Sequence, residues 1–203
     1  MNTERKVHWE KIYATKQPHE VSWTQTVPQT SLDMIHECGL PKTASIIDIG
    51  GGDSNLVDFL LDAGYENITV LDISANALER AKARLGEKAN HVKWIVSDVL
   101  DFQPETTYDI WHDRAAFHFL TEKESIEQYL QLLRKYATSD VIIGTFSDIG
   151  PNKCSGLVVE KYNEDSLEYL MQPDFVKVPC ITTDHITPFD TKQNFLFCHY
   201  KRA

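Results

Sequence analysis

The sequence predicts an α/β fold: a doubly wound, mostly parallel sheet that is covered by helices on both faces and ends in an antiparallel β-hairpin. Three observations support this class. Short apolar, β-branched runs alternate along the chain with segments whose apolar residues recur at helical spacing. The 203 residues are enough for one such domain with a full core. The last third holds two extended runs joined by a loop too short for a parallel crossover.

The first predicted strand and helix flank a glycine turn. The apolar run 45–47 has the composition of a buried strand, and it leads through Asp48 into Gly50, Gly51 and Gly52. Because glycines let the backbone approach a ligand closely, and a helix N-terminus offers free N–H groups, this turn is a candidate nucleotide site. The apolar face of the helix behind it consists of Leu56, Phe59, Leu60 and Ala63, and Gly64 ends it.

The second strand, residues 68–71, ends in an acid. Asp72 lies 72 − 52 = 20 residues after Gly52, the spacing at which an acid meets a ribose hydroxyl in a βαβ nucleotide unit. A dinucleotide fold usually has a third glycine where this chain has Asn55, and Asp48 before the turn would repel a pyrophosphate. The pattern therefore favours a ligand that has a positive charge and no phosphate.

The remaining elements follow in the same alternation. Ser74 is a predicted cap for a helix whose buried side holds Ala77, Leu78, Ala81 and Leu85. Further helices are predicted at about 31–38 and 122–136. Further strands are predicted at 92–99, 108–111 and 141–146, and the final extended runs span 174–183 and 193–200.

These segments resemble the class I S-adenosylmethionine-dependent methyltransferases from about residue 40 to the C-terminus. The shared motifs are Asp48-x-Gly50-x-Gly52, the strand-2 acid Asp72, and a strand ending in Asp98. The resemblance implies a Rossmann-like fold over residues 41–203, with residues 1–40 as an N-terminal cap. It also implies S-adenosyl-L-methionine as cofactor and S-adenosyl-L-homocysteine as product. The implied cofactor-binding residues are Asp48, Gly50, Gly51, Gly52, Ser54, Asp72, Ile73, Asp98 and Val99.

Polar residues follow the predicted strand 108–111, the fourth along the chain. The superfamily places substrate-facing groups at this position. His112, Asp113 and His118 are candidates for a base that removes a proton from the acceptor, and Arg114 can clamp an anionic group. Asp113 and Arg114 can instead pair with each other, and a histidine after a strand is more often a plain hydrogen-bonding group. The density of ionisable residues in one loop favours contact with cofactor or acceptor.

Composition excludes several other classes. The formal net charge is −10, which disfavours nonspecific nucleic-acid binding. Methyltransferases that act on DNA bases share an Asn/Asp-Pro-Pro-aromatic motif after strand 4, where this chain has His112-Asp113-Arg114-Ala115, so we expect no DNA substrate. No apolar run of 18 residues and no apolar leader is present, so we expect no membrane association.

The cysteines indicate a reducing compartment. Four widely spaced cysteines without a C-x-x-C pair predict reduced thiols and a cytoplasmic protein. Cys180 and Cys198 fall in strand patterns and are predicted to be small core residues. Cys154, Cys180, Cys198 and His185 lack the spacing of a preorganised site, so no metal is predicted.

The N-terminal residues 1–29 have little regular pattern but carry Trp9, Tyr13 and Trp23. These aromatics either pack on the domain edge or form a lid, and the H-W-x-x-x-Y opening resembles that of bacterial small-molecule methyltransferases. We therefore predict a cytoplasmic methyltransferase with a small-molecule acceptor. Two alternatives stay open: a protein side-chain (for example lysine) methyltransferase, and a non-enzymatic nucleotide-binding sensor. No pattern in the sequence bears on the acceptor atom or the oligomeric state.

Overall fold

The computed structural model describes residues 3–203 and confirms the α/β class. The helices are α1 (Thr3–Thr15), α2 (Gln29–Glu37), α3 (Leu56–Asp62), α4 (Ala75–Leu85), α5 (Lys123–Tyr136) and α6 (Glu164–Met171). The strands of the main sheet are β1 (Ser45–Ile49), β2 (Asn67–Asp72), β3 (Val92–Val96), β4 (Tyr108–Arg114), β5 (Ala137–Phe146), β8 (Phe175–Ile186) and β9 (Lys192–Arg202). A small hairpin pairs β6 (Lys153–Cys154) with β7 (Leu157–Val158).

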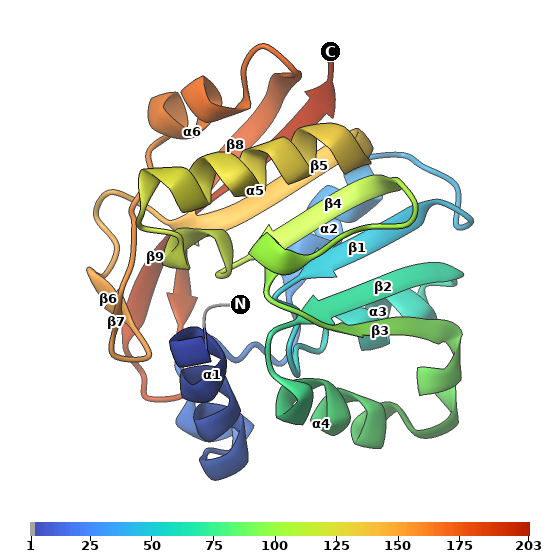
Figure 1. Ribbon diagram of the computed structural model, residues 1–203, viewed down its shortest axis with the longest axis vertical. Coiled ribbons are helices and arrows are strands. Elements are labelled where there is room, and N and C mark those ends of the chain that lie inside the picture. The colour runs from blue at the N-terminus through green and yellow to red at the C-terminus, as the bar shows by residue number, and fades with distance from the viewer. Residues whose placement is uncertain (1–2) are drawn as a thin grey trace.

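The seven strands of the main sheet have the order β3-β2-β1-β4-β5-β9-β8. Strands β1 to β5 pair in parallel, whereas β9 pairs antiparallel with both β5 and β8, as the short connection between β8 and β9 predicts (Figure 1). The chain turns outward from β1 in both directions, so β1 and β4 flank the topological switch point. Ligands of open α/β sheets bind beyond the carboxyl ends of the strands at this point.

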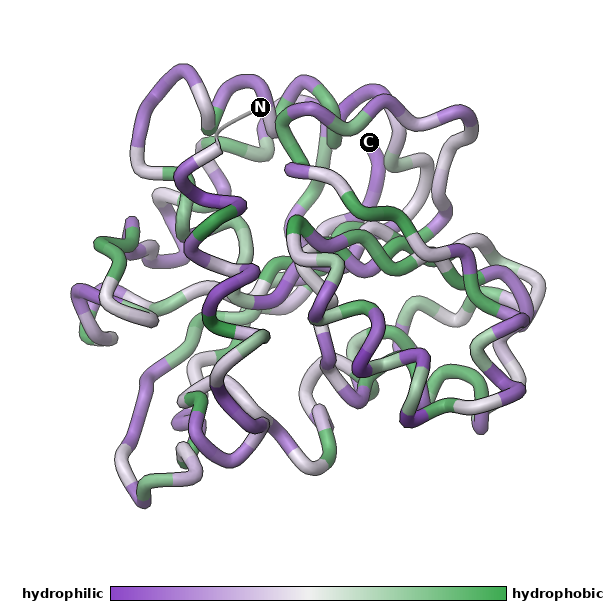
Figure 2. Tube along the Cα trace, turned by 60° about the horizontal axis from the view of Figure 1, so that its bottom comes forward, coloured by the Kyte–Doolittle hydropathy of each residue, from purple (hydrophilic) through white to green (hydrophobic). Residues whose placement is uncertain are grey.

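Alternation along the strands builds one core on each face of the sheet. Neighbouring residues such as Ile46 and Ile47 point to opposite faces because side chains alternate along a strand. One core packs the sheet against α5 and α6, and the other packs it against α2, α3 and α4. In Figure 2 the helices change between hydrophilic and hydrophobic colour along their length, as expected of helices that bury one face.

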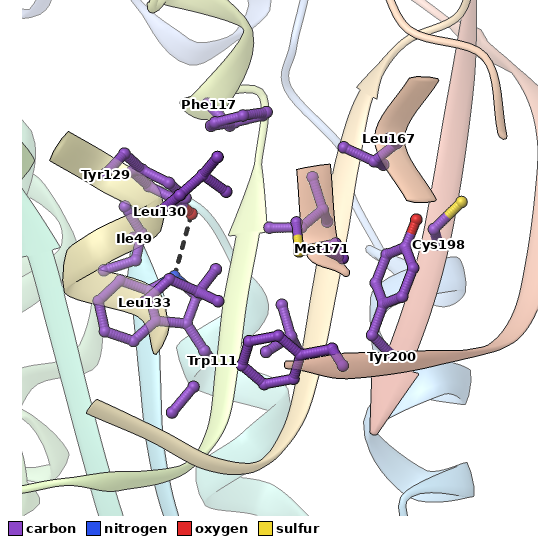
Figure 3. Close-up of a cluster of buried hydrophobic side chains, with 14 of the residues drawn as sticks. Ile49, Trp111, Phe117, Tyr129, Leu130, Leu133, Leu167, Met171, Cys198 and Tyr200 are labelled. Carbon is purple, nitrogen blue, oxygen red and sulfur yellow. Dashed lines mark hydrogen bonds between the residues drawn. The ribbon is translucent and has the colours of Figure 1, made fainter. Parts of the chain in front are cut away.

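The α5 core contains a chain of hydrogen bonds that fixes the end of β4. Trp111 Nε1 donates to the Tyr129 hydroxyl at 3.0 Å, shown as the dashed line in Figure 3. The Tyr129 hydroxyl donates in turn to Asp113 Oδ2 at 2.9 Å. Asp113 Oδ1 accepts the backbone N–H groups of Ala116 and Phe117 at 3.1 and 3.0 Å. The buried carboxylate therefore holds the turn that follows β4.

Several predicted boundaries were wrong. Strand β4 runs on to Arg114, so His112, Asp113 and Arg114 lie in the strand and not in a loop. His185 likewise lies within β8, and not between the final strands. The N-terminal segment forms the regular helix α1, which has no predicted counterpart because its apolar residues do not recur at a helical period. None of the helices formed by residues 3–203 has the length and apolar character needed to cross a bilayer.

The expectation of four reduced thiols was wrong for one pair. Cys180 and Cys198 form a disulfide, and Cys38 and Cys154 are free and buried. The antiparallel register sets Cys180 opposite Cys198, with Cα atoms 4.1 Å apart. A register shift between Lys177 and Cys180 sets this alignment, and counting along the sequence does not reveal it. Cys198 is fully buried, as predicted for a core residue.

We expect Tyr129→Phe to destabilise the fold by about 1–3 kcal/mol, because it removes a hydroxyl that serves both the Trp111 indole and the buried Asp113 carboxylate. Urea unfolding measures the loss. Tyr169→Phe is the matched control, since Tyr169 is 80% exposed. Equal stability of the two variants would contradict the role given to this hydrogen-bond chain.

Candidate active site

A cavity lies at the carboxyl ends of β1, β2, β3 and β4, where the switch point predicts a ligand. Eight of the nine predicted cofactor residues line it: Asp48, Gly50, Gly51, Ser54, Asp72, Ile73, Asp98 and Val99. The ninth, Gly52, lies directly behind the lining, between Tyr13 and Asp72. Segments distant in sequence thus converge on one site.

The glycine turn depends on the absence of side chains. Gly50 has a φ of 65°, and a Cβ atom there would lie 2.5 Å from the Cβ of Ala116 in the turn after β4. Gly52 has a φ of 51°, and its Cβ would lie 2.8 Å from the Tyr13 hydroxyl. Any larger residue would therefore push apart the β1 and β4 turns or displace α1.

Asp72 is buried at the carboxyl end of β2. Its Oδ1 accepts the backbone N–H of Ser74 at 2.7 Å. Burial, together with the nearby carboxylates of Asp53 and Asp48, raises the pKa of Asp72 to about 7 against the opposing effect of backbone hydrogen bonds. Hydrogen-bond donors such as ribose hydroxyls would stabilise the charged form of this buried carboxylate.

The predicted polar loop divides between the two faces of β4. Alternation turns His112 and Arg114 into the cavity and turns Asp113 towards α5, where its carboxylate is fully buried. Burial raises the pKa of Asp113 to about 6. Within residues 3–203, no ion pair joins Asp113 to Arg114, although the sequence allows one. Asp113 is thus a structural residue, and we withdraw it as a candidate base.

His118 also lies outside the cavity lining. It follows β4 in a short 3-10 turn, and its ring packs between Phe119 and Phe146. The backbone N–H of Phe146 donates to His118 Nδ1 at 3.3 Å. Burial, reinforced by the charge of Arg114, lowers the pKa of His118 to about 3. A histidine that does not face the cavity cannot take a proton from an acceptor there, so we withdraw His118 as well.

His112 is held in a buried chain of three residues. Asp48 and His112 are register partners on β1 and β4, and Asp48 Oδ1 lies 2.7 Å from His112 Nδ1. On the other side of the ring, His112 Nε2 lies 2.9 Å from the hydroxyl of Ser31 on α2. With the Nδ1 proton donated to Asp48, Nε2 accepts from Ser31. Sequence reasoning missed Ser31, which lines the cavity 81 positions away from its partner.

Helix α1 packs across the cavity near the carboxyl ends of the strands (Figure 1). Glu10 accepts hydrogen bonds from the Ser74 hydroxyl and from the backbone N–H groups of Ala75 and Asn76, so it caps α4. Arg5 pairs with Asp98 at 2.8 Å. The first contact ties α1 to the helix that follows Asp72 and Ile73, and the second ties it to Asp98 itself.

Aromatic side chains form the wall of the cavity on the side of α1. Trp9 contacts Trp23 and Phe119 edge to face, with ring centroids 5.6 and 5.0 Å apart. Tyr13 lies 6.3 Å from both tryptophans. All four rings line the same cavity. Such a wall suits a sulfonium, because a cation is attracted to ring faces.

Cys154 and His185, which the sequence analysis considers as metal ligands, differ in their position. Cys154 of the β6–β7 hairpin lines the cavity, and burial raises the pKa of its thiol to about 11. His185 lies outside the lining and binds the carbonyl of Ser22 through Nε2 at 2.7 Å. Among residues 3–203, a different set has its possible ligand atoms within 4.8 Å of one another, namely Cys38, Asp140 and His199. Hydrogen bonds within that set and to Met34 account for it.

Residues 46–138 match the family model described as a methyltransferase domain. This segment holds the glycine turn, Asp72 and Asp98, and its match, together with the sheet order, supports the resemblance to class I S-adenosylmethionine-dependent methyltransferases. The match also supports the enzyme class and the cofactor that the sequence predicts.

Similar proteins have diverse acceptors. The chain is 26% identical over 121 residues to an eEF1A lysine and N-terminal methyltransferase of Mus musculus, covering 59% of this chain and 17% of that protein. It is 29% identical over 111 residues to malonyl-[acyl-carrier protein] O-methyltransferase 1 of Ilyobacter polytropus, covering 54% and 41%. The chain thus spans less than half of these relatives. A solved S-adenosylmethionine-dependent methyltransferase from Anabaena variabilis superposes with a TM-score of 0.75 at 16% identity, covering 100% of this chain and 96% of that one.

The raised pKa of Asp72 predicts pH-dependent cofactor binding. Ribose hydroxyls donate more strongly to the ionised carboxylate, and ionisation is lost as the pH falls through about 7. We therefore expect the affinity for S-adenosylhomocysteine to fall about tenfold between pH 8 and pH 6. Calorimetry at several pH values measures this slope.

The matched variant is Asp72→Asn, which keeps the shape of the side chain and cannot ionise. It should bind S-adenosylhomocysteine more weakly than the wild type at pH 8 and lose the pH slope. An unchanged slope in this variant would assign the titration to another group.

Proposed function

We propose that this protein transfers the methyl group of S-adenosylmethionine to a small-molecule acceptor. The observation that carries the proposal is the aromatic wall in which Trp9 contacts both Trp23 and Phe119, and we assign this wall to the acceptor side of the cavity. A compact acceptor fits between this wall and β4. The relative from Ilyobacter, whose name gives an acyl-carrier-bound malonyl group as acceptor, also supports a small acceptor group.

The predicted cofactor residues have separate roles in this proposal. Asp72 accepts from the ribose hydroxyls, and Asp98 lies at the adenine end, one strand further out. The glycine turn leaves room for the amino-acid end of the cofactor beside Asp48. When bound, the cofactor supplies a methyl group on a positively charged sulfur that is an intrinsic leaving group.

The chain Ser31–His112–Asp48 provides a route for a proton. A nucleophile with an ionisable proton gives it up as it attacks the methyl carbon in line with the departing sulfur. Ser31 and His112 both line the cavity, so the proton passes to the hydroxyl while the hydroxyl proton moves to His112 Nε2. The imidazolium that results is stabilised by Asp48 at 2.7 Å.

The two alternative functions make different demands on the site. A protein side-chain methyltransferase would use the acidic surface, with a net charge of −10, to dock a basic partner, and the Mus musculus relative supports it. A nucleotide sensor would not need the His112 chain. A cytoplasmic location remains a prediction, and the Cys180–Cys198 disulfide weighs against it because such bonds are rare in reducing compartments.

The proposal is tested by methyl transfer from labelled S-adenosylmethionine. Pools of small molecules and a whole-cell protein extract are offered in parallel, and labelled product is separated by size. Label in the small-molecule fraction supports the proposal. Label only in protein supports the first alternative, and no transfer with intact cofactor binding supports the sensor.

We expect His112→Gln to lower the methyl-transfer rate by about 10²- to 10⁴-fold, the usual range for loss of a base. The amide of glutamine can still donate to Asp48, so the affinity for S-adenosylhomocysteine should stay near that of the wild type. His36→Gln is the matched control, because His36 is exposed on α2. A fully active His112→Gln enzyme would show that no proton passes through this residue.

The proposal also gives residues 1–40 the role of a lid over the cofactor. Glu10 holds α1 to the N-terminus of α4 by three hydrogen bonds. Glu10→Ala should therefore speed dissociation of S-adenosylhomocysteine by about two- to tenfold, as expected for loss of a helix cap. Stopped-flow fluorescence of the tryptophans follows the release. Glu4→Ala on the same helix is the control, and equal rates for both variants would refute the lid.

A further inference from the structure

Arg114 is the last residue of β4 and lines the acceptor side of the cavity. Its Nη1 donates to the backbone carbonyl of Trp23 at 3.0 Å. Its Nε and Nη2 are buried and have no hydrogen-bond partner within residues 3–203. The guanidinium group lies over the ring of Phe195, 4.9 Å from the centroid. One edge of the group is therefore fixed and the other is left without a partner.

The charge of Arg114 has no counterion in the described part of the chain. Within residues 3–203, no carboxylate oxygen lies within 4.0 Å of a nitrogen of the guanidinium group. The neighbouring acid Asp48 is already bound to His112. Burial lowers the pKa of Arg114 to about 10, so the group is still charged at neutral pH. A buried, unpaired charge is costly, which points to an anionic ligand as the missing partner.

The two groups without a partner have the geometry of a fork. The Nε–H and the Nη2–H of a guanidinium group lie on the same edge and point in parallel, which matches the two oxygens of a carboxylate. Because Nη1 is held by Trp23 and the plane is held by Phe195, this fork is preorganised. Burial of His118 and His185, together with the charge of Arg114, lowers the pKa of both imidazoles, so neither competes as a cation.

We propose that the methyl acceptor carries a carboxylate and that the Nε–Nη2 edge of Arg114 binds it side-on. This inference rests on the proposed function and names its substrate class. The cavity wall beside Arg114 contains Trp9, Trp23 and Phe119, so the remainder of the acceptor is apolar or aromatic. The acceptor class is thus a small organic acid with an apolar body.

The cofactor carries a carboxylate of its own, and the position of Arg114 assigns the fork to the acceptor. Asp72 lies on β2, on one side of β1, and Phe195 lies on β9, on the opposite side of β4. The guanidinium group therefore lies towards the half of the sheet that the predicted cofactor residues do not occupy. A direct measurement has to distinguish these two carboxylates.

The Nε–H signal of Arg114 in ¹⁵N-labelled protein makes this distinction, with assignment by its loss in Arg114→Lys. S-adenosylhomocysteine is added first, followed by benzoate, phenylacetate or indole-3-acetate, each matched with its primary amide. We expect the acids to shift the signal at saturating cofactor and the amides to leave it unchanged. A shift caused by S-adenosylhomocysteine that leaves no further response to acids would assign the fork to the cofactor and overturn the proposal. No response to any acid would overturn it too.

Binding and activity give the second readout. Arg114→Gln should weaken binding of the responding acid at least about tenfold, as for loss of a charge-assisted pair, with unchanged affinity for S-adenosylhomocysteine. Arg202→Gln, on the exposed end of β9, is the matched control. If neutral small molecules are methylated and Arg114→Gln has no effect on them, the carboxylate inference fails and the proposed function stands. If only protein is methylated, the proposed function itself fails.

Discussion

The parallel pairing of β1 with β4 is the constraint on which the rest of the site depends. It sets Asp48 beside His112 and brings the glycine turn against the turn after β4, where a single Cβ at Gly50 would collide with Ala116. Because the chain winds outward from these two strands, their carboxyl ends remain uncovered by the sheet itself. The predicted cofactor groups on β1 and the proposed acceptor groups on β4 thus face one cavity.

The alternation of side chains along β4 places the residues that stabilise the fold on one face and the residues that line the cavity on the other. Trp111 and Asp113 face α5, where Tyr129 joins them and fixes the turn that follows. His112 and Arg114 face the other way, into the cavity. The apolar core on one face therefore positions polar groups on the other face, and two nitrogens of Arg114 among them have no hydrogen-bond partner within residues 3–203. The deep burial of Asp113 provides the rigidity that a preorganised Arg114 requires.

Local patterns were sufficient to predict the first βαβ unit of the fold. The strand at 45–49, the glycine turn and Asp72 follow each other within one βαβ unit, and periodicity and spacing identify them. The Ser74 cap was predicted from its residue type, and its hydroxyl accepts from Ala77 as expected. Such features depend on neighbours a few residues away, which a single sequence contains in full.

Features that depend on register or on distant segments were missed. The apolar pattern of β4 stops at Trp111, so the sequence predicts a loop after it, although Asp48 and Tyr129 form hydrogen bonds with the polar residues that follow. The partnership of Ser31 with His112 spans 81 residues, and the Cys180–Cys198 bond depends on a register shift in the final hairpin. No spacing rule identifies such contacts.

The central claim is that this switch point holds S-adenosylmethionine and not a dinucleotide. Calorimetric titration of S-adenosylhomocysteine and of NAD into the same protein tests it most directly. The account predicts that S-adenosylhomocysteine binds at one site per chain and that NAD produces no binding heat, since Asp48 would repel a pyrophosphate. Binding of NAD without binding of S-adenosylhomocysteine would contradict it.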